Sequence, residues 1–318
     1  MEKEVVIIAP CFNEEDLVLS FLDLLEQELH DVGRIFRIIM VDDGSTDDTV
    51  KLLKNYTFKS PFLHLDPIVL MFNLGHQGAI YQGLLYAEKI KANTVIIMDS
   101  DGEDDPKAIP LLLQKSDADV VHVVRGKRSE KLSFRIAYSV YKQLFKVITG
   151  KRMNFGNYCL LNRRVLTAIT QTSFVHFAAH LSKKKGKHEF VIFNRRKRLK
   201  GESKMSTTRL IHHAFKSFAE YAEELLMMFL KAFVALGVAL VFLIFYVLYK
   251  KFFTDSAILG WTSTVSIGLF NGALISIGFF IIGNLLLNNA YQKSGTQKAI
   301  YRNISLKART LPSKKQSA

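Results

Sequence analysis

Short apolar runs alternate with amphipathic stretches along the N-terminal part of the chain. Five runs have the length and composition of buried strands, at positions 5–9, 36–41, 68–72, 95–98 and 120–124. Between them, apolar side chains recur at helical spacing after residue 14, over 46–54 and over 77–91. Strands that alternate with helices predict an α/β fold, with a parallel or mostly parallel sheet covered on both faces.

The pattern continues less regularly towards residue 206. We predict later strands at 157–161 and 189–194, and helices at 163–169 and 174–184. An amphipathic helix is expected over 130–149, where one face is apolar and the other carries lysine and arginine. This helix is either a packed helix with a solvated basic face or a helix that lies in a membrane interface.

The composition changes at Leu225. Residues 232–249 form an uncharged apolar run of 18 residues, extended by 225–230, and residues 265–287 form a second uncharged run of 23 residues. Because a bilayer core of ~30 Å needs about 20 helical residues, both runs qualify as membrane spans. The alternative is a pair of buried helices in a soluble protein. We predict two transmembrane helices within 225–290, at about 228–250 and 264–287.

The flanks of these runs give a predicted orientation and domain plan. Apolar residues at helical spacing over 207–224 predict an amphipathic juxtamembrane helix, and 291–318 form a basic tail. Positively charged residues prefer the cytoplasmic side of a membrane. We therefore expect an integral membrane protein of the cell membrane, whose catalytic domain over 1–206 and both termini are cytoplasmic.

Charge is distributed unevenly along the chain. The net charge is +14, but residues 1–124 carry 10 Lys and Arg against 22 Asp and Glu, a balance of −12. Residues 125–216 carry 23 against 3, a balance of +20. Such asymmetry indicates different partners, with the acidic part suited to metal-assisted binding and the basic part to phosphates. Nucleic acid is not expected as a partner, because no recognised nucleic-acid motif accompanies the charge.

The fourth strand is followed by two carboxylates, Asp99 and Asp101. In open α/β sheets, ligands gather outside the carboxyl ends of the strands. An Asp-x-Asp sequence there can present oxygen ligands to a hard divalent cation, which can hold a diphosphate. The first two strands also end in candidate residues, because Phe12 can lie against a base and Asp43 can accept hydrogen bonds from a base or ribose.

Together these stretches resemble the family 2 glycosyltransferases with a GT-A fold, and among them the polyprenyl-phosphate glycosyltransferases (the dolichyl-phosphate mannose synthase-like group). The matching segments are Ala9-Pro10-Cys11-Phe12-Asn13-Glu14-Glu15, Val41-Asp42-Asp43-Gly44-Ser45-Thr46-Asp47, Asn73-Leu74-Gly75 with Ala79 and Gly83, Met98-Asp99-Ser100-Asp101, and Arg198-Leu199-Lys200-Gly201-Glu202-Ser203-Lys204. The resemblance implies a GT-A domain followed by a two-helix transmembrane hairpin.

The resemblance also implies a role for each matching residue. The nucleoside would be held by Pro10, Phe12, Glu14, Val41 and Asp43. The catalytic group would consist of Asp99, Asp101 and Arg125, with Ser100 touching the donor through its backbone. Asp99 and Asp101 would bind Mg²⁺ or Mn²⁺ and the diphosphate. Arg198 and Lys204 would close over the phosphates from a loop.

The implied reaction is the inverting transfer of a sugar from a nucleotide-sugar to a polyprenyl phosphate of the undecaprenyl type, at the cytoplasmic membrane face. Relatives with this layout serve cell-envelope glycan synthesis and can assemble as tetramers, so a homo-oligomer is a possible state. One alternative is a glycosyltransferase with a hydroxyl acceptor on a glycolipid or polysaccharide. Another is a catalytically weak membrane scaffold, against which the retained acidic and basic motifs argue.

The sequence departs from the family pattern at two places near Asp101. Glu103 stands where an amide is common, and it is either a third metal ligand or an acidic loop residue. The acceptor region reads Asn154-Phe155-Gly156-Asn157-Tyr158-Cys159, with amides in place of two carboxylates and a cysteine in place of an arginine. His76 is the histidine closest to the expected donor pocket, and we interpret it as a surface or packed residue.

Overall fold

The computed structural model describes residues 4–125, 132–150, 155–194, 196, 216–253, 260–293 and 299–304. The chain divides into two compact units. The first contains Met1–Leu132, Met153–Lys216 and Thr296–Ala318, and the second contains Ser133–Arg152 and Ser217–Gly295. The chain therefore leaves the first unit after Lys216 and returns to it at Thr296.

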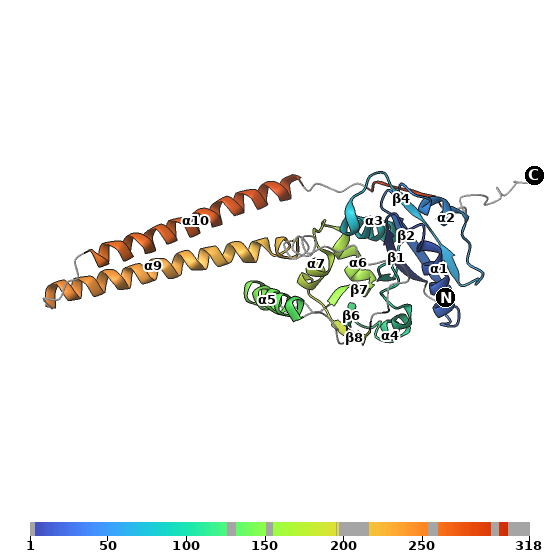
Figure 1. Ribbon diagram of the computed structural model, residues 1–318, viewed down its shortest axis with the longest axis horizontal. Coiled ribbons are helices and arrows are strands. Elements are labelled where there is room, and N and C mark those ends of the chain that lie inside the picture. Colours follow the sequence, from blue (N-terminus) through green and yellow to red (C-terminus); the bar gives the residue numbers. More distant parts are fainter. Residues whose placement is uncertain are drawn as a thin grey trace, which may run out of the picture. The chain divides into compact units, whose positions relative to one another are not determined.

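The first unit is built on one mixed sheet (Figure 1). Its strands are β1 (Val5–Cys11), β2 (Phe36–Asp42), β3 (Leu63–Leu65), β4 (Ile68–Leu70), β5 (Thr94–Ile97), β6 (Val120–Arg125), β7 (Phe155–Asn162), β8 (His188–Phe193) and β9 (Tyr301–Asn303). They lie in the order β8-β6-β7-β5-β1-β2-β4-β9, and β3 also pairs with β2. Only the pairings of β7 and β9 are antiparallel among the described strands, so the predicted mostly parallel sheet is confirmed.

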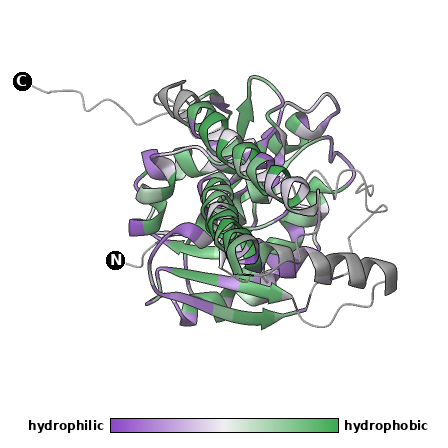
Figure 2. Ribbon diagram, turned by 90° about the vertical axis from the view of Figure 1, so that its left-hand side faces the viewer, coloured by the Kyte–Doolittle hydropathy of each residue, from purple (hydrophilic) through white to green (hydrophobic). Residues whose placement is uncertain are grey.

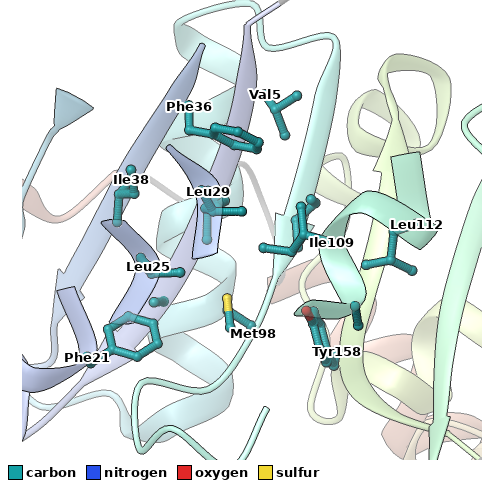
Figure 3. Close-up of a cluster of buried hydrophobic side chains, with 14 of the residues drawn as sticks. Val5, Phe21, Leu25, Leu29, Phe36, Ile38, Met98, Ile109, Leu112 and Tyr158 are labelled. Atoms are coloured by element: carbon teal, nitrogen blue, oxygen red, sulfur yellow. The ribbon is translucent and has the colours of Figure 1, made fainter. Parts of the chain in front are cut away.

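Helices cover both faces of this sheet. They are α1 (Val18–Leu29), α2 (Thr49–Asn55), α3 (Gly75–Lys89), α4 (Ile109–Gln114), α6 (Arg163–Thr170) and α7 (Phe177–Lys183), with a 3₁₀ turn at Pro106–Ala108. Alternate residues of a strand face opposite sides, and β1 accordingly sends Val5 and Ile7 into one apolar cluster and Val6 and Ile8 into another. Figure 3 shows the first cluster, where α1 and α4 meet the sheet.

Helix α3 approaches the sheet at Gly83. A Cβ atom at this position would lie 2.5 Å from Ile8 Cγ2 and 3.0 Å from Val41 Cγ2, so a larger residue would push the helix away. The close contact is made with β1 and β2, the strands whose ends carry candidate residues. It therefore holds the middle of α3 against these two strands.

Two elements of the sheet were not predicted from the sequence. Strand β3 has three residues and was not recognised. Strand β9 falls within the predicted basic tail, but it pairs antiparallel with β4 through Ile68↔Asn303, Val69↔Arg302 and Leu70↔Tyr301. Its three residues are too few to give a periodic signal, and their partner lies far away in the sequence.

The second unit contains α5 (Leu132–Thr149), α9 (Ala222–Phe253) and α10 (Trp261–Lys293). Helices α9 and α10 run side by side, and most of their surface is hydrophobic (Figures 1 and 2). Two segments, Ala222–Lys250 and Thr262–Leu287, are long and apolar enough to cross a membrane. Of their most apolar windows, 0% and 6% of residues are buried, which is unlike the core helices of a soluble protein.

One face of α5 packs within this second unit. Tyr141 Oη and Ser217 Oγ are 2.7 Å apart, and the buried ring of Phe145 lies 5.7 Å from that of Phe218 and 5.2 Å from that of Tyr221. Val147, in contrast, is 79% exposed. The contacts support the packed interpretation of this helix on that face. Of the predicted juxtamembrane helix, residues 207–215 lie outside the described residues.

A histidine pair lies in the sheet between β6 and β8. His122 is fully buried and stacks on Phe155 at 3.7 Å between ring centroids. Its Nε2 is 2.9 Å from His188 Nδ1, and His188 Nε2 is 3.1 Å from the Lys184 carbonyl oxygen. A carbonyl oxygen can only accept, so His188 Nε2 donates to Lys184. Burial first, and then His188, lower the pKa of His122 to about 3.

This lowered pKa predicts a loss of stability in acid. Below pH 6.5 the unfolded chain binds a proton at His122 that the folded chain does not, so stability falls as the pH drops towards 3. Between pH 7 and pH 5 this residue accounts for about 2 kcal/mol. His122→Phe keeps a stacked ring, and its melting temperature in detergent should fall less over this range than that of the wild type. Equal losses in the two proteins would show that His122 does not titrate in this way.

Candidate active site

The topology gathers several turns at one edge of the sheet. Strands β5, β1 and β2 are adjacent and parallel, with Ile97 paired to Ile8 and Cys11 to Asp42, so their C-terminal ends lie together. Strand β7 is antiparallel to β5 and to β6, so β6 ends and β7 begins at this same edge. The candidate residues after β1, β2, β5 and β6 therefore share one edge, as is usual for ligand sites in such sheets.

The turns after β1 and β2 are locked to each other. Asn13 has a φ of 50°; its N–H donates to Ser45 Oγ at 2.9 Å, and its Oδ1 accepts from the N–H of Thr46 at 2.8 Å. The N–H of Glu14 donates to Thr49 Oγ1 at 2.9 Å. The Phe12 side chain remains 43% exposed. Its ring is therefore accessible to a flat ligand such as a base.

Asp43 connects the β2 turn to the loop that follows β4. The carboxylate is 3% exposed, and its Oδ1 accepts from the N–H of Leu74 at 2.7 Å. Burial raises the pKa of Asp43, although the N–H groups of Leu74 and Gly75 oppose the rise. Asp43 thus holds the end of this loop, at Leu74 and Gly75. This structural role was not predicted from the sequence.

Ser100 joins the turns that follow β1 and β5. Its Oγ lies 2.7 Å from the carbonyl oxygen of Pro10 and 2.6 Å from Glu14 Oε2. A hydroxyl has one hydrogen to donate, so the serine bonds one of these acceptors at a time. Ser100 therefore contacts two other residues that were predicted to contact the donor, Pro10 and Glu14.

The loop after β5 is a compact acidic turn. The N–H of Asp99 donates to Asp104 Oδ2 at 3.0 Å, and the N–H of Glu103 donates to Asp101 Oδ1 at 2.9 Å. Gly102, with a φ of 77°, makes the reversal between them. The turn concentrates negative charge at the edge of the sheet, where it favours a cation.

Asp99 and Asp101 provide the hard oxygen atoms that Mg²⁺ and Mn²⁺ prefer. In the part of the chain that the structure describes, no three His, Cys, Asp or Glu side chains are gathered to hold a metal ion. Glu103 therefore does not form a three-ligand cluster with Asp99 and Asp101. Such a pair suits an ion that completes its coordination with substrate phosphates and water, as Mg²⁺ commonly does.

His76 belongs to this site, which the sequence analysis did not predict. Its Nε2 is 3.3 Å from Asp99 Oδ1 and 3.1 Å from Asn157 Nδ2, and its side chain is 44% exposed. Burial alone would lower the pKa of His76, but Asp99, Asp104 and Glu14 outweigh it and raise the pKa. The available signal was its position after Gly75, at the first turn of a helix that follows a strand. Through His76, the altered 154–159 segment meets the Asp-x-Asp sequence.

Arg196 lies beside the acidic turn. Its N–H donates to the Glu103 carbonyl oxygen at 3.0 Å, and its Nη1 is 3.9 Å from both Asp105 Oδ1 and Glu28 Oε1. Arg125 ends β6, where it pairs with Phe193 of β8. Arg198, Lys204 and Asn154 lie outside the described residues.

Comparison with known proteins identifies the family. The model of glycosyl transferase family 2 matches residues 6–180, more than half of the chain. The chain therefore belongs to glycosyl transferase family 2 and is a glycosyltransferase. The match contains every candidate residue of β1, β2 and β5 and the turns after them.

Individual relatives agree with this assignment. The chain is 25% identical over 289 residues to the uncharacterized glycosyltransferase YkcC of Bacillus subtilis (strain 168), covering 88% of this chain and 87% of that protein. It is 28% identical over 220 residues to the undecaprenyl-phosphate 4-deoxy-4-formamido-L-arabinose transferase of Klebsiella pneumoniae (strain 342), covering 66% of this chain and 65% of that one, slightly under two thirds.

A solved structure supports the fold. Mannosyl-3-phosphoglycerate synthase from Rubrobacter xylanophilus matches with a TM-score of 0.52 and 15% identity, over 70% of this chain and 74% of that one. At 15% identity, this similarity supports the fold and nothing more. The predicted GT-A fold, followed by two apolar helices, is confirmed.

The position of His76 predicts a loss of activity on its removal. His76→Ala takes away the side chain that lies between Asp99 and Asn157, and hydrogen bonds to charged groups contribute about 1.5–3 kcal/mol. Sugar transfer should fall roughly 10-fold or more in kcat/KM. Because the side chain is half-exposed, the melting temperature should change little.

The matched control is His30→Ala, at an exposed histidine after α1 that contacts Gln27 and Asp31. It should keep the wild-type kcat/KM. Wild-type activity in His76→Ala would remove His76 from the site.

Proposed function

We propose that this glycosyltransferase moves a sugar from a nucleotide-sugar to a polyprenyl phosphate of the undecaprenyl type, with inversion at the anomeric carbon. The observation that carries the proposal is the contact of Ser100 with Pro10 and Glu14. It joins the β1 turn to the Asp-x-Asp turn in a chain that also has two candidate membrane spans. The name of the Klebsiella relative, an undecaprenyl-phosphate sugar transferase, supports the choice of acceptor.

In the proposed reaction, an oxygen of the lipid phosphate attacks the anomeric carbon of the sugar. The bond from that carbon to the β-phosphate oxygen breaks, and the nucleoside diphosphate leaves with the electron pair. A phosphate monoester is largely ionised near neutral pH, so the nucleophile needs no strong general base. What the enzyme must stabilise is the charge that develops on the leaving diphosphate.

The residues divide this work as follows. The nucleoside is bound by Pro10, Phe12, Glu14, Val41 and Asp43. A divalent ion, held by Asp99 and Asp101 and by the diphosphate, would neutralise negative charge on the leaving group. Arg125, Arg198 and Lys204 provide positive charge for the donor and acceptor phosphates, within the stretch 125–216 whose balance is +20.

We also propose that the catalytic domain and both termini face the cytoplasm. A hairpin of two spans returns the chain to the side from which it entered. The pairing of β9 with β4 supports this, because the chain after α10 is again part of the α/β unit. The lysines and arginines of the 291–318 tail favour the cytoplasmic side.

One observation favours a second candidate function. Transfer to a hydroxyl, as in glycolipid or polysaccharide synthesis, needs a general base, and His76 is an imidazole within 3.3 Å of Asp99. Under this alternative the donor side is unchanged and the acceptor differs. The product of the reaction therefore distinguishes the two candidates.

The test is transfer of labelled sugar by the full chain in detergent. Purified protein is incubated with Mg²⁺ or Mn²⁺, undecaprenyl phosphate and a panel of radiolabelled UDP- and GDP-sugars. Label should enter the lipid fraction with at least one donor and should require the metal. Asp101→Asn should reduce this transfer by roughly 100-fold or more, because a ligand of the charge-stabilising ion is lost.

The matched control is Asp117→Asn, which makes the same chemical change at an exposed position before β6. It should transfer sugar like the wild type. The proposal fails if no donor labels lipid phosphate while the protein still binds a nucleotide. An active, metal-dependent Asp101→Asn would contradict the proposed role of Asp101.

A further inference from the structure

The three-residue strand β9 lies at the edge of the sheet next to β4 and follows the two apolar helices in the sequence (Figure 1). So short an edge strand has little stability of its own. Both backbone and side-chain contacts nevertheless connect it to the rest of the first unit.

The backbone ladder extends beyond the three paired residues. The N–H of Met71 donates to the Ile300 carbonyl oxygen at 3.1 Å, and the N–H of Ile304 donates to the Pro67 carbonyl oxygen at 3.0 Å. Antiparallel ladders alternate between bonded and non-bonded pairs. Midway between these two bonds, Val69 and Arg302 therefore form a hydrogen-bonded pair. The N–H groups of Tyr301 and Asn303 therefore point away from β4.

The side chain of Asn303 bonds two buried polar residues, Asp66 and Tyr86. Its Nδ2 donates to Asp66 Oδ1 at 2.7 Å and to Tyr86 Oη at 2.5 Å, and Tyr86 Oη donates to Asp66 Oδ2 at 2.7 Å. Arg37 Nη1 lies 3.3 Å from the same Asp66 oxygen. Asp66 is 5% exposed, so losing Asn303 would leave a buried carboxylate oxygen with fewer donors.

Two further contacts tie the strand to α3. The Tyr301 ring meets the Tyr86 ring edge-on, at 5.3 Å and 85°. The N–H of Ile300 donates to Gln82 Oε1 at 3.1 Å, and Gln82 is 3% exposed. The strand is therefore held by α3 as well as by β4, and α3 is the helix whose first turn carries His76.

The last bond of the ladder lies next to the nucleoside side of the site. Met71, bonded to Ile300, begins the loop 71–75, and three residues later the N–H of Leu74 donates to Asp43. The same loop lies close to the β2 turn, since a Cβ atom on Gly44 would be 3.3 Å from Asn73 N. The start of the loop is thus fixed by β9 and its end by Asp43.

We propose that β9 is a positioning strand, which holds the loop 71–75 against Asp43 and so shapes the donor side of the active site. Tyr301 and Asn303 are positioning residues that act through Tyr86, Asp66 and β4. The stretch that follows the apolar hairpin thereby contributes to nucleotide binding without touching the nucleotide. The role in nucleotide binding rests on the proposed function, whereas the coupling between strand and loop does not.

The test compares two substitutions at Arg302 in the full chain in detergent. The Arg302 side chain is exposed, but its N–H belongs to the bonded pair with Val69. Arg302→Pro removes that N–H and disfavours the strand. Arg302→Ala is the matched control, because it removes the same side chain and keeps the backbone bond.

The main measurement is amide hydrogen exchange without any ligand. In Arg302→Pro, the amides of both Met71 and Leu74 should exchange roughly 10-fold faster or more, while Arg302→Ala should match the wild type. Asn303→Leu removes the side-chain bonds to Asp66 and Tyr86 and keeps the backbone ladder. It should also make the amides of Met71 and Leu74 exchange faster. The inference is overturned if Leu74 keeps its protection when Met71 loses it, or if Met71 keeps its protection in both Arg302→Pro and Asn303→Leu.

A second measurement connects the strand to the proposed function. The dissociation constants of UDP and GDP, each measured with Mn²⁺, give the affinity of the nucleotide site. The nucleotide that binds the wild type should bind Arg302→Pro several-fold more weakly and Arg302→Ala equally well. Unchanged affinity in Arg302→Pro would contradict the effect on the site. If the wild type binds neither nucleotide, the proposed function is in question, and hydrogen exchange still decides the coupling.

Discussion

The parallel alignment of β5, β1 and β2 is the constraint on which the rest of the site depends. It brings three turns to one edge, and the hydrogen bond of Ser100 with Pro10 or Glu14 holds two of them together. Carboxylates that are distant in sequence therefore lie near one another, and each turn contributes only part of the site. Backbone N–H groups, such as that of Leu74, bond carboxylates of these turns and offset part of their mutual repulsion.

The α/β unit is completed by chain that follows the apolar helices. The chain leaves this unit before α9 and completes its sheet with β9 after α10. Asn303, Tyr86 and Asp66 make that return specific through a buried polar group in place of a large apolar contact. Directional hydrogen bonds of this kind favour one register for a short strand.

Much of this structure follows from the sequence because its signals are local. Strand-length apolar runs placed β1, β2, β5 and β6, and acidic residues after them identified the edge that carries the site. The features that were not predicted depend on long-range pairing. Nothing in the three residues of β9 names β4 as their partner, and nothing near His76 shows that Asn157 lies 3.1 Å away. Likewise, the bond between Asp43 and Leu74 needs two turns to meet in space.

We propose that this edge of the sheet is where a donor sugar is joined to a lipid phosphate. The most direct test is ³¹P NMR of the purified lipid product, together with its sugar-to-phosphorus ratio. The account predicts one phosphorus per transferred sugar, present as a phosphodiester to the anomeric carbon. A product whose phosphate is still a monoester, with the sugar attached through a glycosidic bond to a hydroxyl, would contradict it.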